Sequence, residues 1–523
     1  MSGVEAPLLR IAISLIVGIA VGDALKVPLP LLPVFVGTVV TALLARRWAQ
    51  VQSLLICLCV VVLGALLVVQ QKKGLQAGWP KGTAHFEAVV VSEPIEKPKT
   101  MAMDLLISPS GRKVKAYIHK DERSQRLHIG DGCRVTGVNY SATSNTHHPS
   151  ARSAEGRLLP AGRKNTYDRY LAVHGFCGTI YIKSWQWKPA VVQLGSLPMV
   201  ERCCIFFLKQ RARLLERFRS GGLKDDEYAV VAAMALGDKT ALTKELKELY
   251  AETGASHVLA LSGLHLSIVF SLLSLLTGGA YGRFGWSLNR RLRVAVQVVT
   301  VLSIWAFVFL VGLPVSVVRS ASMLTLFALF SLGHRQHMSV NILCFTAIVM
   351  LCYSPLTLFD VGFQLSFMAV LSILLFLPFF TFSPSHSFTS SPFHSFTSSP
   401  FHSFTSSLFS FLLGLIAVSL AAQIGTAPLT AYYFGRFPTW FLLTNLVVVP
   451  AATLILYLSL ATLLFPPLAM VLSMVVSALN SVLTTLSTLP LASIGGLHPT
   501  VWQVVLIYAV IFGAYIFIKR VGG

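Results

Sequence analysis

Residues 440–464 read WFLLTNLVVVPAATLILYLSLATLL, and none of these 25 residues is charged. A helix needs about 20 predominantly apolar residues to cross the hydrocarbon core of a bilayer, so this stretch predicts a membrane-spanning helix. Eleven similar runs lie along the chain, three before residue 72 and eight between residues 256 and 518. The run at 340–353 is short for a span. The sequence therefore predicts a polytopic α-helical membrane protein with nine to twelve spans.

Charge is scarce and unevenly distributed. Only 12% of the 523 residues are charged and the mean hydropathy is +0.70, whereas soluble domains carry roughly a quarter charged residues. Residues 1–250 hold 33 Lys and Arg and 19 Asp and Glu, but residues 251–523 hold only 9 and 2. The two acids of the second half are Glu252 and Asp360. This composition excludes a soluble enzyme, a disordered tail protein and a cation channel lined by acidic rings.

The positions of the basic residues predict the orientation of the helices. Arg46 and Arg47 follow the second apolar run, and most basic residues after 280 fall in loops on the same side, whereas the opposite loops hold only Arg436. Basic loops stay in the cytoplasm. Residues 1–71 are thus about three helices that begin in the cytoplasm, since the first run lacks the basic start of a cleavable signal. Residues 72–190 then lie outside.

Residues 72–190 form a domain of a different kind, with 19 Lys and Arg against 9 Asp and Glu. Alternating apolar and polar residues predict strands in AHFEAVVVSEP (84–94), MDLLIS (103–108), KVKAYIH (113–119), GCRVTGV (132–138) and FCGTIYIK (176–183). Five short strands in about 100 residues predict a small extracytoplasmic all-β, OB-like barrel. Cys133 and Cys177 fall in the last two strands. In an oxidising compartment they form a disulfide, or they remain unpaired thiols.

Two further segments complete the division of the chain. Residues 191–255 contain ERCCIFFLKQRARLLERF (201–218), whose mixture of Phe, Leu and Arg predicts amphipathic helices in the headgroup plane. Residues 256–523 form the main transmembrane domain. Within it, residues 381–408 repeat the string HSFTSSPF, which is too rich in Ser, Thr and Pro to build a core and predicts a loop.

Polar residues at membrane depth are the candidates for a transport path. The segment MALGDKTALTKELKELYAETGASHVLALSGLHLSIV (234–269) contains Asp238, His257, Ser262 and His265. On one continuous helix the two histidines would lie about 80° apart; the alternative is that they only hold the bundle together. A Ser-His-Asp hydrolase would need a G-x-S-x-G elbow, and a zinc site would need a third ligand. The sequence therefore predicts no enzyme, no metal and no cofactor.

Later apolar runs add five candidates, which are Arg319, Asp360, Gln364, Gln423 and Asn445. Arg319 either extends to the membrane interface or meets a phosphate in a wet cavity. Asp360 precedes a helix, which it can cap, or it pairs with Arg319. A proline follows Gln423 and Asn445 by five residues in each case. Broken helices that carry polar groups indicate a transport path.

Several of these segments resemble, in the same order, the competence domain of ComEC-type DNA-internalisation proteins. They are ALGDKTALTKELKELYAETGASHVLALSGLHLSIV, PLTLFDVGFQLSFMAV and AAQIGTAPLTAYYFGRFPTWFLLTNLVVVP, while GDGCRVTG and NTYDRYLAVHGFCGTIYI resemble the family's small OB-like outer domain. The resemblance implies a channel that passes single-stranded DNA across the bacterial cytoplasmic (inner) membrane during natural transformation. It carries over the candidates named above together with Gly237 and Gly263. It implies as partners a DNA receptor outside and an ATPase or DNA-binding protein inside, since the sequence has no nucleotide-binding P-loop.

The resemblance has one departure. Many family members continue into a metallo-β-lactamase-like domain, thought to degrade the other strand. This sequence contains no H-x-H-x-D-H string, so we expect the chain to lack that domain and its nuclease activity.

The charge pattern agrees with DNA as the substrate. A polyanion favours a path poor in acids, as residues 251–523 are. The basic outer domain also contains rings suited to base stacking, such as Tyr117, Tyr140, Phe176, Tyr181 and Trp185. Two alternatives remain: a transporter or flippase for another anionic substrate, and a membrane assembly protein with a closed helical bundle. The sequence does not set the oligomeric state.

Overall fold

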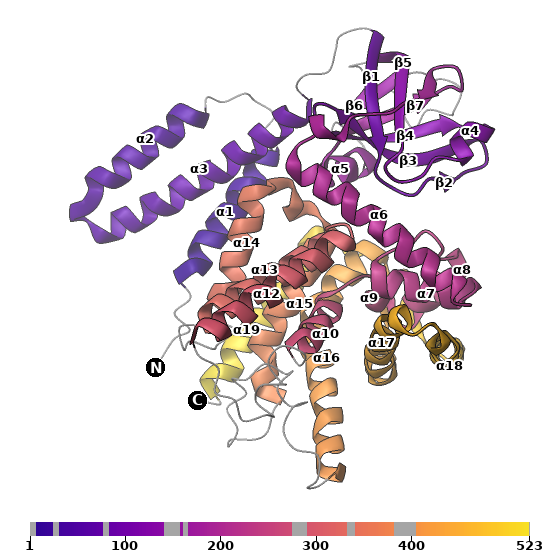
Figure 1. Cartoon of the computed structure of the whole chain (residues 1–523). Helices are drawn as coiled ribbons and strands as arrows, with labels where there is room; N and C mark the ends of the chain where they lie inside the picture. The colour runs from indigo at the N-terminus through magenta and orange to yellow at the C-terminus, as the bar shows by residue number, and fades with distance from the viewer. Residues whose placement is uncertain are drawn as a thin grey trace. The chain divides into compact units, whose positions relative to one another are not determined.

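The computed structural model describes residues 7–24, 31–76, 83–140, 157–160, 166–274, 290–331, 340–380 and 404–521. The chain forms two compact units (Figure 1), which we describe separately. Unit 1 comprises Met1–Ala212 and Ala347–Asp360, and unit 2 comprises Arg213–Thr346 and Val361–Gly523. Most of the predicted repeat loop lies outside the described residues. Its last part, from Phe404, belongs to a helix instead.

Helices dominate the structure, and seven of the described ones are long and apolar enough to cross a membrane. They are α1 (Pro7–Ala24), α3 (Ala49–Gln76), α15 (Val361–Phe380), α16 (Phe404–Phe434), α17 (Phe441–Leu464), α18 (Ala469–Ser487) and α19 (Val501–Val521). Shorter apolar stretches lie in α10 (Gly263–Ser274), α12 (Arg290–Leu310), α13 (Val315–Ser331) and α14 (Val340–Tyr353). The chain is therefore a polytopic, mostly helical membrane protein, as predicted. The total of nine to twelve spans stays a prediction.

Two N-terminal helices of unit 1, α1 and α2 (Leu31–Leu44), both pack against α3 (Figure 1). Glycines allow α1 and α3 to approach closely. A Cβ atom on Gly18 would lie 2.1 Å from the carbonyl oxygen of Val61, and one on Gly22 would lie 2.5 Å from the Cα of Ala65. The spacing of these two glycines is the small-xxx-small pattern by which membrane helices associate.

The second part of unit 1 contains the strands of a closed sheet. They are β1 (Thr83–Val90), β2 (Ile95–Glu96), β3 (Thr100–Ser108), β4 (Arg112–His119), β5 (Gly132–Tyr140), β6 (Arg157–Pro160), β7 (Phe176–Ile182) and β8 (Trp187–Pro189), accompanied by α4 (Glu122–Gln125) and α5 (Thr166–Val173). All five predicted strands are present, as β1, β3, β4, β5 and β7. Along the sheet the order is β1-β3-β4-β7-β6-β5, and β5 pairs back with β1, which closes a barrel.

The alternation that predicted the strands also separates the two faces of the barrel. Along β4, Val114, Ala116 and Ile118 are buried in the barrel core, while Lys115 and Tyr117 point the other way and are only half-buried. Successive side chains of a strand point to opposite faces. The apolar half of the pattern therefore fills the barrel, and the basic and aromatic half forms its outer surface.

The predicted disulfide between Cys133 and Cys177 is not formed, because both thiols are free and buried. Each cysteine is the second residue of its strand, β5 and β7 respectively. These strands run in opposite directions, since β6 pairs in parallel with β5 and antiparallel with β7. The two cysteines therefore lie toward opposite ends of the barrel. Burial raises the pKa of the Cys133 thiol to about 12 and also raises the pKa of Cys177.

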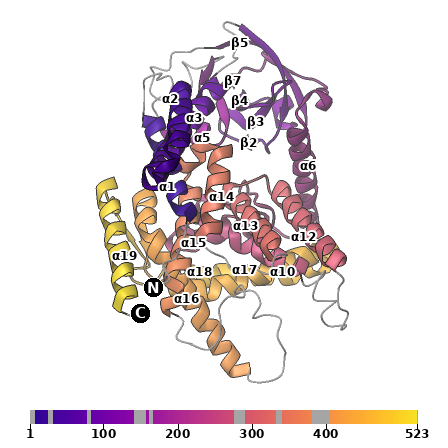
Figure 2. The same ribbon diagram turned by 90° about the vertical axis from the view of Figure 1, so that its left-hand side faces the viewer.

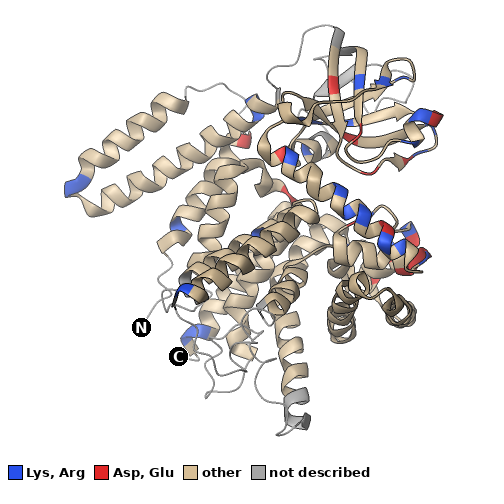
Figure 3. Cartoon of the chain, in the orientation of Figure 1, with Lys and Arg blue, Asp and Glu red and all other residues tan. Residues whose placement is uncertain are grey.

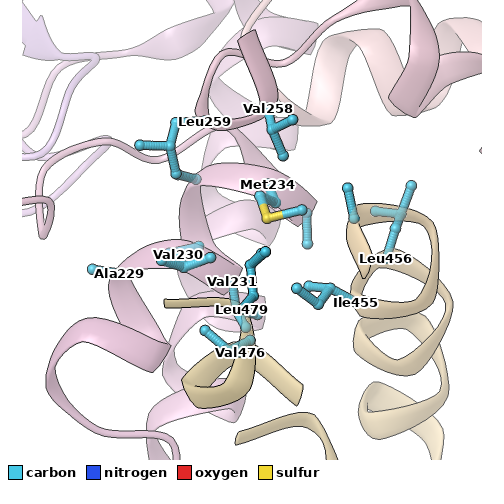
Figure 4. Close-up of a cluster of buried hydrophobic side chains, with 14 of the residues drawn as sticks. Ala229, Val230, Val231, Met234, Val258, Leu259, Ile455, Leu456, Val476 and Leu479 are labelled. Carbon is cyan, nitrogen blue, oxygen red and sulfur yellow. The ribbon is translucent and has the colours of Figure 1, made fainter. Parts of the chain in front are cut away.

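The core of unit 2 forms around α7 (Asp225–Leu236), in which every residue from Tyr228 to Leu236 is buried. Figure 4 shows Val230, Val231 and Met234 of this helix facing Ile455 and Leu456 of α17 and Val476 and Leu479 of α18. Next to it in sequence are α6 (Met199–Ser220), α8 (Lys244–Glu252) and α9 (Ser256–Leu259). Within the segment predicted to be interfacial, α7 is thus a core helix, while α6 has the basic, amphipathic composition that was expected.

The long helices of unit 2 pack in pairs. In both views α15 lies along α16 (Figures 1 and 2), and a Cβ atom on Gly425 would lie 2.5 Å from the Cβ of Ser372. The hydroxyl of Ser372 donates to the carbonyl oxygen of Ala421 at 2.6 Å. Figure 3 shows charged residues concentrated on the barrel strands and on α6, α7 and α8, whereas α10 and α13 to α18 are almost free of them. Polar groups inside this bundle are therefore few and conspicuous.

Candidate functional site

The helix expected from residue 256 onward is broken. Helix α9 ends at Leu259 and α10 begins at Gly263, so residues 260–262 are not helical. One carbonyl group freed by the break, that of Leu261, accepts a hydrogen bond from the Ser316 hydroxyl at 2.7 Å. Irregular backbone at membrane depth is tolerated where its polar groups are satisfied by protein or water. The apolar run from residue 256 is therefore not one continuous helix, and the break is the centre of the candidate site.

His265 lies in the first turn of α10 with its side chain buried. The backbone N–H of Ser262 donates to His265 Nδ1 at 3.3 Å, and Ser262 Oγ lies 3.1 Å from the same nitrogen. His265 Nε2 is buried without a hydrogen-bond partner. In the part of the chain that the structure describes, no carboxylate therefore orients this ring, and the Ser262–His265 pair has no third member of a Ser-His-Asp triad there.

A loop after α7 lies against the break. Gly237 has φ +72°, and a Cβ atom there would lie 2.4 Å from Leu261 Cδ1 and 3.4 Å from the carbonyl oxygen of Val311. Glycine suits this position because it adopts positive φ without steric cost. The next residue, Asp238, is buried and accepts hydrogen bonds from the hydroxyl of Thr240 at 2.9 and 3.0 Å. The buried carboxylate of Asp238 thus directly follows the glycine that contacts the break.

Arg319 lies on α13. Of the Lys and Arg residues that the structure describes, it is the one that is buried. Its Nη2 donates to Ser320 Oγ at 3.1 Å and its Nη1 to Met323 Sδ at 3.6 Å. The guanidinium also lies 5.6 Å from the ring centroid of Phe367 on α15. The side chain is 5% exposed, which contradicts the alternative in which it extends to an interface. The backbone of Gly263 also approaches this guanidinium closely, since a Cβ atom on Gly263 would lie 3.4 Å from Arg319 Nη2.

The turn that leads into α13 is strained. Gly312 has φ +88° and Leu313 has φ +58°, and leucine rarely adopts this left-handed conformation. Such a residue costs about 1–3 kcal/mol and persists only where its surroundings hold it. Leu313 packs in the apolar cluster that surrounds the break. The strained turn places Ser316 where its hydroxyl donates to the carbonyl oxygen of Leu261. The strain at Leu313 and the hydrogen bond that satisfies the break are therefore linked through this turn.

The remaining candidates of unit 2 lie in other helix contacts. His257 is exposed, with Nδ1 3.0 Å from the carbonyl oxygen of Gly254. Gln364 accepts from the hydroxyl of Tyr433 at 2.7 Å. Asn445 donates to Ser419 Oγ at 3.3 Å, and its Oδ1 is buried without a partner. Gln423 is half-buried on α16. The structure therefore joins Ser262, His265 and Arg319 around Gly263 and leaves these four residues outside that cluster.

The prolines expected to break helices do not do so. Pro428 lies inside α16 and Pro450 inside α17, and both helices continue through them. Proline in a helix leaves the carbonyl four residues earlier without its usual donor. The Tyr508 hydroxyl donates to the carbonyl of Gly425 at 2.7 Å, in the turn before Pro428. The carbonyl that Pro428 leaves without its usual donor is that of Ile424, so this hydrogen bond reaches the residue next to it.

Asp360 belongs to unit 1, where it follows a 3₁₀ segment, η4 (Pro355–Phe359). One of its carboxylate oxygens lies 3.6 Å from Nε2 of His174, and its extended backbone suits a residue that precedes a helix. The adjacent Phe359 ring lies 4.2 Å from the guanidinium of Arg169. The pair between Asp360 and Arg319, which falls in unit 2, stays a prediction.

Sequence reasoning missed several partners of these residues. Ser316 and Ser320 are three residues before and one residue after Arg319, and small hydroxyl residues so close to an arginine in an apolar run were a usable signal. His174 and Arg169 lie in the NTYDRYLAVHG string, which resembles the outer domain of the family. No sequence signal pointed to their contact with the segment that ends at Asp360, because about 190 residues separate them.

The outer face of the barrel carries an aromatic cluster. Tyr117 and Tyr181 stack with ring centroids 5.0 Å apart, and the Tyr117 hydroxyl lies 3.1 Å from that of Tyr167. The ammonium group of Lys97 lies 4.7 Å from the Tyr117 ring. Burial raises the pKa of both Tyr167 and Tyr181, so their hydroxyls stay neutral under physiological conditions.

The other predicted rings differ from this pair. The Trp185 side chain is largely exposed, with Lys183 Nζ 5.0 Å from its ring. Phe176 lies 5.9 Å from Lys115 Nζ, while the Tyr140 side chain lies outside the described part. Among the described residues there is no group of three or more His, Cys, Asp and Glu side chains that could hold a metal ion.

Comparison with known proteins identifies the family. The chain is 25% identical over 384 residues to ComE operon protein 3 of Bacillus subtilis (strain 168), which covers 72% of this chain and 42% of that protein. It is 32% identical over 258 residues to an uncharacterized protein of Aquifex aeolicus (strain VF5), covering 49% of this chain and 53% of the relative. The chain thus spans about half the length of these relatives or less. No solved structure matches.

The family model for the Competence protein matches residues 234–521, a span that contains Asp238, the break, Arg319 and the long helices α15 to α19. This match extends over more than half of the chain. The chain belongs to the competence protein family.

Proposed function

We propose that this protein passes single-stranded DNA across the bacterial cytoplasmic membrane during natural transformation. The observation that carries the proposal is that the Competence protein match, residues 234–521, includes a polar cluster inside an apolar bundle, formed by Ser262, His265 and Arg319. Ionisable groups at membrane depth are costly and usually mark a transport path. The resemblance to DNA-internalisation proteins supplies the substrate.

The charge distribution supports a polyanionic substrate. Residues 251–523 hold two acids in all, so a strand with one negative charge per nucleotide meets little repulsion in the helical bundle. Among the described residues of 251–523, Arg319 is the cationic side chain that is buried. A path for a cation would need the opposite distribution of charge.

We assign to the barrel the role of an OB-like domain that collects DNA outside the membrane. Support comes from the strand order β1-β3-β4-β7-β6-β5 with β5 returning to β1, in which the four-residue β6 is inserted into a closed sheet of five longer strands. OB-folds are small five-stranded Greek-key barrels that bind oligonucleotides. The stacked Tyr117 and Tyr181 beside Lys97 combine aromatic faces with positive charge, as single-strand binding surfaces do. The net charge of +10 in residues 72–190 acts in the same direction.

In this proposal the protein is a channel and not an enzyme. Among the described residues no carboxylate partners the ring of His265, so the Ser262–His265 pair lacks the third member of a Ser-His-Asp triad. Sustained movement in one direction then requires other proteins, a DNA receptor outside and an ATPase or DNA-binding protein inside, whereas a strand supplied in excess on one side passes an open channel down its own concentration gradient.

The test is deletion of the gene in a naturally transformable host, followed by exposure to duplex DNA labelled along one strand. We expect the label to bind the cell surface as before but to stay outside the cytoplasm, with a loss of transformants that the restored gene reverses. Normal transformation in the deletion strain contradicts the proposal. Loss of another anion from the cytoplasm with normal transformation favours the transporter or flippase alternative.

A further inference from the structure

We propose that the first turn of α10 and Arg319 form a subsite for one backbone phosphate of the translocated strand. The inference rests on the proposed function and adds to it the position where the strand is held. Three elements meet at this point: the break at 260–262, the start of α10 at Gly263, and α13 with Ser316, Arg319 and Ser320. All belong to unit 2.

The hydrogen bonds of Arg319 are incomplete. A guanidinium has five N–H donors and no acceptor, yet the described partners of Arg319 are a hydroxyl, Ser320 Oγ, and a weak acceptor, Met323 Sδ. Its Nε is buried and has no hydrogen-bond partner among the residues that the structure describes. No carboxylate pairs with it among the described residues. Buried charges in proteins are normally paired and hydrogen-bonded. The unused donors of Arg319 therefore indicate that its partner is a negatively charged group with acceptor oxygens.

His265 adds a second unused donor. The N–H of Ser262 donates to Nδ1 of this ring, and a neutral imidazole that accepts at one nitrogen carries its proton on the other. The proton is therefore on Nε2, which is buried and has no acceptor. Both unmatched groups, Arg319 Nε and His265 Nε2, are donors. The group that complements them must be an acceptor, which excludes a metal ion or an ammonium group.

The backbone supports the same choice. The first N–H groups of a helix have no partner within the helix, and together with the helix dipole they favour an anion. Gly263 stands at this terminus, and a Cβ atom there would lie 2.7 Å from Ser320 Oγ and 3.4 Å from Arg319 Nη2. The absence of a side chain thus lets the start of α10 lie directly against Ser320 and the guanidinium, so the free N–H groups of the helix and the cation are close enough to share one anion. Phe367 lies against the guanidinium and holds its plane.

A phosphate group matches this set of donors. Its oxygens are acceptors only, and a guanidinium contacts two of them at once. In the proposed function the molecule that brings phosphates into the bundle is the strand itself, one per nucleotide. A lipid headgroup offers the same chemistry at the interface, so the experiment must separate the two sources.

The experiment uses the full chain in proteoliposomes of phosphatidylcholine and phosphatidylglycerol, with single strands at saturating concentration. One strand has ordinary phosphodiester linkages, and the other alternates them with uncharged methylphosphonate linkages. Uptake of each strand is measured for the wild type, for Arg319→Met and, as a matched control, for Arg436→Met, whose arginine is exposed. Protein in the membrane is quantified by blotting.

We expect the wild type and Arg436→Met to take up the ordinary strand in preference to the methylphosphonate strand. In Arg319→Met the ratio of the two uptakes should fall about tenfold, because a charged hydrogen-bonded contact is lost. An unchanged ratio in Arg319→Met overturns the subsite. An equal loss for both strands also overturns it, because Arg319 would then serve a lipid headgroup or the fold.

A second variant keeps the test decisive if Arg319→Met does not accumulate. Gly263→Ala retains the charge but pushes the start of α10 away from Ser320 and the guanidinium, and Gly414→Ala is its control, since a Cβ atom on Gly414 meets nothing within 4 Å. We expect Gly263→Ala to lower the uptake ratio and Gly414→Ala to leave it unchanged; equal ratios in the two variants overturn the subsite. If the wild type takes up neither strand, the proposed function falls, and the subsite falls with it.

Discussion

At the scale of single residues, the two barrel cysteines give a sharp prediction. All eight cysteines of the chain are free in the structure. Denatured protein that was never reduced should therefore react with eight equivalents of a maleimide, counted by mass spectrometry. Six reactive thiols would show that one pair is a disulfide. If that pair were Cys133 and Cys177, the result would contradict their placement toward opposite ends of the barrel in β5 and β7.

The buried thiol of Cys133 also predicts a pH dependence. Burial raises its pKa from 9.0 to about 12, so the folded protein keeps this thiol protonated while the unfolded chain ionises it. Stability should then be unaffected below about pH 9 and should fall as the pH rises toward 12. Cys133→Ala should reduce this alkaline loss, whereas Cys133→Ser should destabilise the barrel by about 1–3 kcal/mol at every pH, because it buries a hydroxyl. Thermal unfolding in detergent at several pH values measures both effects.

At the scale of an element, α18 presents three different faces. Leu472, Val476 and Leu479 face the core, while Ser477, Ser481 and Thr484 follow one another at helical spacing on an exposed side. With Asp226 and Glu227 of α7 and with Asn480, these three residues line a wide-open hollow of about 430 Å³ at the surface. Exposed apolar residues, among them Val471 and Val482, occupy the third face.

The faces of α18 predict unequal access to water. In a cysteine-free background, single cysteines at Ser477, Ser481 and Thr484 should react with a membrane-impermeant thiol reagent at least about tenfold faster than cysteines at Val471 and Val482. The reason is that thiolate reactivity requires water, which the polar face meets and the apolar face does not. Equal rates on both faces would mean that the polar residues of α18 are covered by lipid or by protein.

At the scale of the whole molecule, the charge distribution predicts how DNA binding responds to salt. Residues 72–190 carry a net charge of +10, and three phosphate contacts would give a slope of about −2 in log affinity against log salt. Affinity of the full chain in nanodiscs for an oligonucleotide should therefore fall about 20-fold between ~50 and ~200 mM salt. Lys97→Gln, which removes the cation beside Tyr117, should make the slope shallower by about 0.7. A slope near zero would exclude an electrostatic role for the barrel.

The sequence was a good guide where a pattern is local. The apolar runs became helices, and the five alternating runs became β1, β3, β4, β5 and β7, because burial of one face depends on a repeat that is visible in the sequence. It was a poor guide where a pattern is interrupted by tertiary contacts. The run from residue 256 looks continuous, yet the chain leaves the helix at 260–262, because Ser316 satisfies the carbonyl of Leu261 from another helix.

The candidate site shows the same division between local and distant causes. Its residue types were visible from the start, since Ser262, His265 and Arg319 are polar residues inside apolar runs. Their grouping was not, because Arg319 is 54 residues from His265 and only the packing of α13 against α10 brings its guanidinium next to Gly263.

The sequence by itself thus determined that this is a membrane protein, where its long apolar helices and five of its strands lie, and which polar residues stand inside apolar runs, because hydropathy and periodicity are properties of short segments. Only the tertiary structure decided that Cys133 and Cys177 are unpaired, that Arg319 is buried without a counter-ion among the described residues, and that Asp360 lies beside His174. These facts depend on strand direction and on helix packing, which arise from contacts between residues far apart in the chain.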